Sequence, residues 1–136
     1  MDHPFADLIG FTVSRDTPGQ CRSEIEARAA LMNPHNVVHG GVLYSLADTC
    51  MGGALYPLLD EGQLCATIDC SITYFRPISG GTVVCEAKVV NKGRSIAALE
   101  AEITNDGKVV ARAYGNFSIM QRRTGDQGTQ AVGAAA

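Results

Sequence analysis

One long segment, residues 41–58, is apolar on nearly every side when it is read at the spacing of a helix. Its apolar residues are Val42, Leu43, Leu46, Ala47, Cys50, Met51, Ala54, Leu55 and Leu58. A helix of this kind must be covered by other elements on most of its sides. Pro57 is expected to kink the helix or to end it one turn early, because proline lacks the N–H and clashes with the preceding turn.

The rest of the chain reads as strands around that helix, after a short amphipathic opening at residues 4–9. Alternating or β-branched patterns predict strands at residues 22–30, 65–76, 82–91, 94–104 and 108–120. Asn91-Lys92-Gly93 and Asn105-Asp106-Gly107 supply tight hairpin turns, so the last three strands are expected to be consecutive and antiparallel.

An antiparallel sheet curled around one central helix satisfies both patterns, which is an α+β fold. Small residues on the predicted inner face of the sheet would let it approach the helix closely. These residues are Ala87, Ala97, Ala101, Ala111 and Ala113.

Length and composition predict one domain over residues 1–123, followed by a tail at 124–136 that is expected to be disordered. A net charge of −3 argues against general binding to nucleic acid. No apolar stretch reaches the roughly 18 residues of a membrane span, and no signal-peptide pattern is present, so a cytoplasmic location is expected. The five cysteines form no C-x-x-C pair, and with three histidines no metal site is predicted.

Gly40 and Gly41 precede the predicted helix, where exposed backbone N–H groups favour an oxyanion. Asp48 follows two turns later among apolar residues. An anion-stabilising helix start and a nearly buried acid are the two parts of an acyl-transfer or hydrolysis site. The alternative is a tight turn followed by an acid that only makes a structural hydrogen bond.

Two motifs resemble the hotdog-fold acyl-CoA thioesterases, in particular the phenylacetate-degradation branch. The first is Asn33-x5-His39-Gly40-Gly41-x6-Asp48. The second is Ile72-Thr73-Tyr74-Phe75-Arg76-Pro77 followed by Gly81. The resemblance covers about residues 5–120. Asn36 stands where many relatives have glycine, and Asn also tolerates left-handed backbone angles.

The resemblance implies a role for each motif residue. Gly40 would polarise the thioester carbonyl through its N–H, and Asp48 would be the nucleophile or the general base. Asn33 would fix the loop or the attacking water, which Thr67 would help to hold. Substrate contacts would come from His39, Gly41, Tyr74, Arg76, Gly93 and Arg94. His39 can instead hold the loop, while Arg76 can brace the strand end and Arg94 can be a solvated turn residue. No cofactor is implied, since coenzyme A is part of the substrate.

Helix geometry separates the two central residues of the motif. Gly40 and Asp48 are eight residues apart, which is about 12 Å along a helix. One carbonyl cannot contact both, so the sequence predicts a two-fold dimer with two shared sites, as in the family. Such dimers are expected to pair into a dimer of dimers. Tyr44, Ser45, Asp48 and Gly52 would line the seam.

Two other functions remain open at this stage. A hotdog dehydratase or hydratase would pair a histidine with an acid, and His39 with Asp48 superficially offers such a pair. A non-catalytic acyl-CoA binding module is the other alternative. The preferred acyl group, aryl-acetyl or medium aliphatic, is not determined by the residues.

Overall fold

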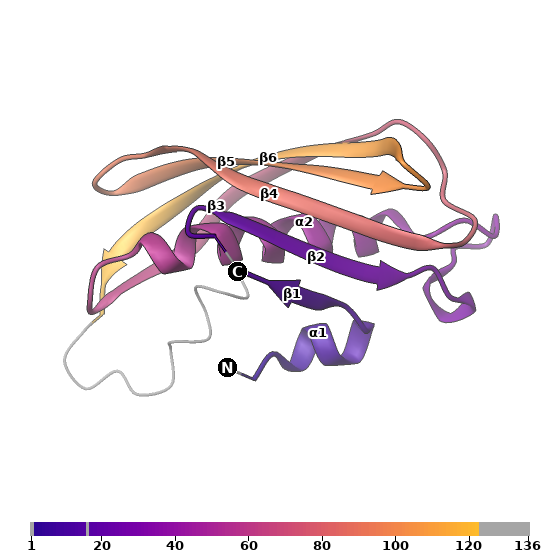
Figure 1. Ribbon diagram of the computed structural model, residues 1–136, viewed down its shortest axis with the longest axis horizontal. Coiled ribbons are helices and arrows are strands. Elements are labelled where there is room, and N and C mark those ends of the chain that lie inside the picture. The colour runs from indigo at the N-terminus through magenta and orange to yellow at the C-terminus, as the bar shows by residue number, and fades with distance from the viewer. Residues whose placement is uncertain (1, 16, 123–136) are drawn as a thin grey trace.

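A computed structural model describes residues 2–15 and 17–122 of the chain. Its helical elements and strands follow one another in a simple order (Figure 1). They are α1 (Pro4–Ile9), β1 (Thr12–Ser14), β2 (Gln20–Glu26), η1 (Ala29–Leu31), α2 (Gly40–Leu55), η2 (Tyr56–Leu58), β3 (Gln63–Tyr74), β4 (Thr82–Lys92), β5 (Ile96–Asn105) and β6 (Lys108–Gln121).

The six strands form one antiparallel sheet in the order β1-β2-β4-β5-β6-β3. Helix α2 runs along one face of this sheet and contacts β2, β3, β4, β5 and β6 (Figure 1). The predicted α+β architecture, a curved antiparallel sheet with one long central helix, is therefore confirmed. The last three strands are consecutive neighbours, as the two hairpin turns predict.

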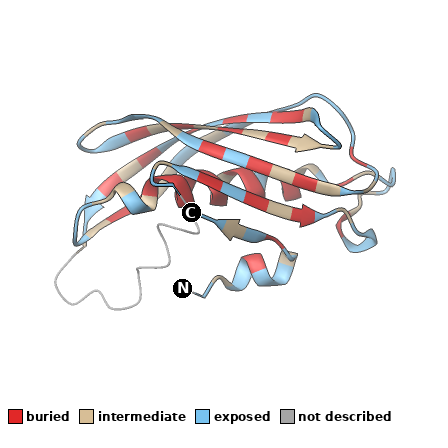
Figure 2. Cartoon of the chain, in the orientation of Figure 1, coloured by how far each residue is buried: buried red, intermediate tan, exposed pale blue. Residues whose placement is uncertain are grey.

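The core lies between α2 and the sheet. Along the strands, buried residues alternate with exposed ones, whereas α2 is buried over most of its surface (Figure 2). Leu46, Met51 and Leu55 have no exposed surface. The five alanines predicted on the inner face are all buried, which allows the close approach of helix and sheet.

Several predicted boundaries need correction. The strand predicted at 22–30 begins at Gln20 and ends at Glu26, because residues 29–31 turn into a 3-10 helix. The helix begins at Gly40 and ends at Leu55, and Pro57 lies in the 3-10 turn that follows, so the helix does end one turn early. Strand β5 begins at Ile96 rather than at residue 94. The short edge strand β1 has no counterpart among the predicted strands.

The predicted tail at 124–136 lies outside the described residues. Among the described residues, no helix has the length and apolar character that a membrane span requires.

Candidate active site

The loop before α2 is shaped by the side chain of Asn33. Its Oδ1 accepts hydrogen bonds from the backbone N–H groups of His35, at 2.8 Å, and Val37, at 3.4 Å. Asn36 has a φ of 62°, so it adopts the left-handed conformation expected where relatives have glycine. The Asn33 side chain is thus engaged within its own loop, which supports a loop-fixing role for this residue.

His39 caps the first turn of α2. Its Nδ1 accepts a hydrogen bond of 2.8 Å from the N–H of Gly41, which satisfies one of the unpaired donors at the helix start. The N–H of Gly40 has no hydrogen-bond acceptor within residues 2–15 and 17–122. Of the two glycines, Gly40 therefore offers the free donor, and it does so at the positive end of the helix dipole.

Tyr74, the last residue of β3, lies against Gly40. Its hydroxyl donates a hydrogen bond of 2.7 Å to the carbonyl oxygen of Gly40. A Cβ atom at Gly40 would lie 3.1 Å from both the Cζ and the hydroxyl of Tyr74. The ring therefore approaches Gly40 closely, and a side chain at position 40 would require the ring or the helix start to give by a few tenths of an ångström.

A groove of about 350 Å³ opens beside Gly40. The backbone N–H of Val38 donates 2.8 Å to the carbonyl of Ile78, which ties the loop before α2 to the segment after β3. The groove therefore brings the predicted residues Gly40, Tyr74 and Arg76 together. Its lining residues are Val37, Val38, Gly40, Leu43, Tyr74, Phe75, Arg76, Pro77 and Ile78.

Asp48 lies two turns further along α2 and is half-buried. The hydroxyl of Thr67, on β3, donates a hydrogen bond of 2.7 Å to its Oδ1. Burial raises the pKa of Asp48 to about 6, and the bond from Thr67 acts in the opposite direction. No lysine or arginine pairs with this carboxylate in the described part of the chain. The sequence left open which effect dominates, and in the structure burial does.

The turn between β4 and β5 holds Gly93 and Arg94. Gly93 closes the turn through its N–H, which donates 2.9 Å to the carbonyl of Ile96, and a Cβ there would lie 2.8 Å from that same oxygen. Arg94 is exposed. Through the sheet register, Thr67 pairs with Phe117 and Phe117 with Ala97, so this turn lies at the Asp48 end of the sheet.

The predicted site residues thus fall into two groups within one chain. Asn33, His39, Gly40, Gly41, Tyr74 and Arg76 gather at the start of α2. Asp48 and Thr67 contact each other further along the helix, with Gly93 and Arg94 at the same end of the sheet. Since Gly40 and Asp48 both belong to the regular helix α2, their separation along its axis is about 12 Å.

Two features of β3 were not predicted, one contact with α2 and one irregularity in its pairing with β6. The Tyr44 hydroxyl donates 3.1 Å to the carbonyl of Cys70. The register of β3 shifts between Thr67 and Asp69, which leaves Ile68 opposite no residue of β6. The spacing of the motif residues contained a signal for this shift, because Thr67 and Tyr74 both contact α2 although they are an odd number of residues apart.

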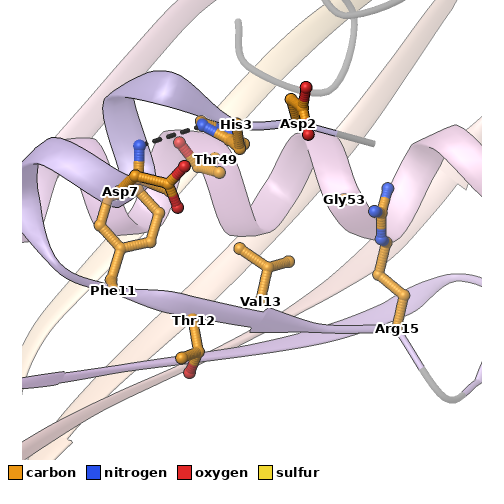
Figure 3. Close-up of a pocket in the computed structure, with 10 residues that line it drawn as sticks. Asp2, His3, Asp7, Phe11, Thr12, Val13, Arg15, Thr49 and Gly53 are labelled. Atoms are coloured by element: carbon orange, nitrogen blue, oxygen red, sulfur yellow. Dashed lines mark hydrogen bonds between the residues drawn. The ribbon is translucent and has the colours of Figure 1, made fainter.

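A separate pocket of about 390 Å³ lies between α1, β1 and α2 (Figure 3). It is lined on the α2 side by Thr49 and Gly53 and contains none of the predicted site residues. Within the described residues, no group of three histidine, cysteine or acidic side chains could hold a metal ion. All five cysteines are free thiols, and burial raises the pKa of Cys65 to about 11, which does not favour a nucleophilic thiolate.

Comparison with known proteins gives consistent matches. The family model described as Thioesterase superfamily matches residues 35–111. The acyl-coenzyme A thioesterase PaaI of Escherichia coli strain K12 is 33% identical over 101 residues, which are 74% of this chain and 70% of that protein.

Solved structures agree with the sequence matches. A mutant of the phenylacetic acid degradation protein PaaI from Thermus thermophilus superposes with a TM-score of 0.79 at 32% identity, covering 85% of this chain and 98% of that one. A thioesterase from Haemophilus influenzae superposes with a TM-score of 0.84 at 23% identity, covering 90% of this chain and 87% of the other. The second likeness concerns the fold alone.

Proposed function

This chain belongs to the thioesterase superfamily, and we propose that it hydrolyses the thioester of an acyl-coenzyme A to a free acid and coenzyme A. The observation that carries the proposal is the pair of half-sites on one helix. A free N–H at Gly40 can stabilise an oxyanion, and a carboxylate at Asp48 is held by Thr67. The name of the Escherichia coli relative supports coenzyme A as the leaving group.

The two half-sites would be completed by a second copy of the chain. Within the part of the chain that the structure describes, β3 pairs with β6 on one side only, and its other edge is flanked by exposed apolar side chains. Ile68 is 53% exposed and Phe75 is 52% exposed. An edge strand with exposed apolar residues is a template for pairing with another strand.

A two-fold axis near Cys70 and Ser71 would match the half-sites. Antiparallel pairing of two β3 strands about that point would set Tyr74 of one chain beside Thr67 of its partner. Because Tyr74 contacts Gly40 and Thr67 contacts Asp48 within each chain, the Gly40 N–H would then face the partner subunit's Asp48. Pairing of two such dimers into a tetramer is a further part of the proposal.

In the proposed reaction, the Gly40 N–H binds the thioester oxygen as it becomes negative. The partner subunit's Asp48 takes a proton from water, whose oxygen attacks the carbonyl carbon. The carbon–sulfur bond then breaks, and the thiolate of coenzyme A takes up a proton. A carboxylate with a pKa of about 6 is better matched to a general base near neutral pH than an unperturbed one. In a single turnover in ¹⁸O-labelled water, this route puts one labelled oxygen in the product acid, whereas an unlabelled acid would indicate direct attack by Asp48 followed by attack of water on the Asp48 carbonyl.

The test is a panel of acyl- and aryl-CoA esters, with release of the coenzyme A thiol as the measured quantity. The unaltered protein should release thiol from at least one aryl-acetyl or medium-chain ester, and Asp48→Ala should lower kcat by about two orders of magnitude or more. Tight binding of acyl-CoA without thiol release would instead indicate a binding module. Hydration of crotonyl-CoA would indicate a hydratase, although His39 already uses Nδ1 to cap α2.

A further inference from the structure

Two side chains of β3, one at an odd-numbered and one at an even-numbered position, point toward the same helix, α2. Thr67 reaches Asp48, and Tyr74 reaches Gly40. The two residues are seven positions apart, and in a regular strand an odd separation puts side chains on opposite faces of the sheet. A regular β3 could therefore serve one half-site of the chain but not both.

The irregularity at Ile68 resolves this conflict. Thr67 pairs with Phe117, but Asp69 pairs with the next residue, Asn116, so Ile68 is the extra residue of a β-bulge. Before the bulge, odd-numbered residues of β3 lie opposite the buried residues of β6, and after it even-numbered residues do. The pairs Thr67–Phe117 and Tyr74–Ala111 thus lie on the same, inner face.

The side chain of Asp69 makes hydrogen bonds to β6 at the bulge. Its Oδ1 accepts hydrogen bonds from the backbone N–H of Asn116, at 3.2 Å, and from the Asn116 side-chain amide, at 2.9 Å. The carboxylate thus engages the β6 residue at the point where the β3 register shifts. Asp69 and Asn116 are both exposed, whereas the neighbouring β6 residues that face α2, Gly115 and Phe117, are buried.

We propose that Asp69 is a positioning residue, which through its clamp on Asn116 keeps the bulge in place and so aims Thr67 at Asp48 and Tyr74 at Gly40. The expected effect on catalysis rests on the proposed function, whereas the expected effect on the geometry of β3 does not. Without the clamp, β3 can relax toward regular pairing, and Thr67 then turns away from the Asp48 carboxylate.

The Asp48 carboxylate reports the position of Thr67 directly. Its pKa is raised by burial and lowered by the Thr67 hydroxyl, and the other titratable groups that interact with it are the Tyr44 phenol and the Cys70 thiol. Asp69 is not among the groups that shift the pKa of Asp48. We therefore expect a change at Asp69 to reach Asp48 mainly through the geometry of β3, and Asp69→Asn controls for the loss of charge.

The experiment titrates Asp48 by ¹³C NMR of its carboxyl carbon in the full chain and measures kcat and KM with the best ester of the panel. Asp69→Ala removes both acceptors, whereas Asp69→Asn keeps Oδ1 and removes only the charge. In Asp69→Ala, we expect the pKa of Asp48 to rise by about half a unit to one unit. We expect kcat to fall about tenfold with little change in KM. In Asp69→Asn, both quantities should stay near those of the unaltered protein.

Glu86→Ala, which removes an exposed carboxylate from the outer face of β4 away from the β3 edge, is the matched control and should change neither quantity. An unchanged Asp48 pKa in Asp69→Ala would overturn the proposal, and so would an equal shift in Asp69→Asn. If Asp69→Ala does not fold, Asn116→Ala takes its place, with the same expected direction and the same overturning result. Because the titration needs no substrate, a shifted pKa in a protein that releases no thiol would refute the proposed function and leave the positioning role standing.

Discussion

The Tyr74 hydroxyl lies 2.7 Å from the carbonyl oxygen of Gly40 and donates a hydrogen bond to it. This contact ties the end of β3 to the first residue of α2. At the other end of the same strand, Thr67 makes the corresponding contact with Asp48. One strand therefore contacts both proposed half-sites, and changes at either contact should have separable effects.

A methyl group at position 40 should disrupt the proposed oxyanion half-site. In Gly40→Ala, the new Cβ would lie 3.1 Å from the Tyr74 ring, so the ring or the helix start must give by a few tenths of an ångström, and a shift of the helix start moves the N–H. We expect kcat for thioester hydrolysis to fall roughly a hundredfold. Gly80→Ala is the control, because a Cβ at Gly80 meets no atom within 4 Å. Full kcat in Gly40→Ala would contradict the expected loss and would show that the Tyr74 ring gives way while the N–H keeps its position.

Removal of the Tyr74 hydroxyl should weaken the tie between β3 and α2. We expect Tyr74→Phe to lower the free energy of unfolding by about 0.5–1 kcal/mol, measured by urea denaturation. Tyr114→Phe removes an exposed hydroxyl that has no hydrogen bond within the described residues, so it should lower the free energy of unfolding by less. Equal losses in the two variants would show that the bond to Gly40 adds nothing to stability.

Ionisation of Asp48 should lower the free energy of unfolding. Its pKa in the folded chain is about 6, above the ordinary value of 3.8, so between these values the folded chain holds a proton that the unfolded chain has released. The contribution of this group to stability is therefore present below about pH 4 and is lost as the pH rises through 6. Asp48→Asn should raise the free energy of unfolding at pH 8, by up to about 3 kcal/mol, and change it little at pH 4. Urea denaturation at the two pH values measures this, and destabilisation at pH 8 would contradict it.

Loss of the Thr67 hydroxyl should shift the pH dependence of catalysis. The bond from Thr67 lowers the pKa of Asp48, so Thr67→Val should raise that pKa further. The acidic limb of kcat/KM, expected near or above pH 6 in the unaltered protein, should then move to higher pH. Thr67→Ser keeps the hydroxyl and should restore the limb. If the acidic limb of kcat/KM does not move in Thr67→Val, the Thr67 hydroxyl does not influence the ionisation of Asp48.

Much of this fold could be predicted from the sequence because its periodic patterns are long. The all-round apolar character of α2 and the two Asn- and Gly-containing turns gave the central helix and the order of β4, β5 and β6. Strand β1, with three residues, is too short for a pattern to be recognised. The end of β2 was misplaced because Ala27 and Ala29 continue its alternation although the backbone has already turned.

The candidate site could be predicted in part. Local motifs placed Gly40 and Asp48 on one helix, and helix geometry separated them. The pKa of Asp48 depends on how far the surrounding sheet buries it, which is a tertiary property. The bulge at Ile68 escaped prediction because the strand was read as regular, although the odd spacing from Thr67 to Tyr74 was visible in the sequence.

We propose that each active site takes Gly40 from one chain and Asp48 from another. Two inactive variants, Gly40→Val and Asp48→Ala, can be co-expressed with different affinity tags, and the mixed dimer isolated by both tags in turn. If the sites are shared, the mixed dimer has one site with both residues intact, and we predict about half of the unaltered kcat per dimer. If Gly40 and Asp48 act within one chain, neither site of the mixed dimer is intact, and a mixed dimer as inactive as its two parents would contradict the account.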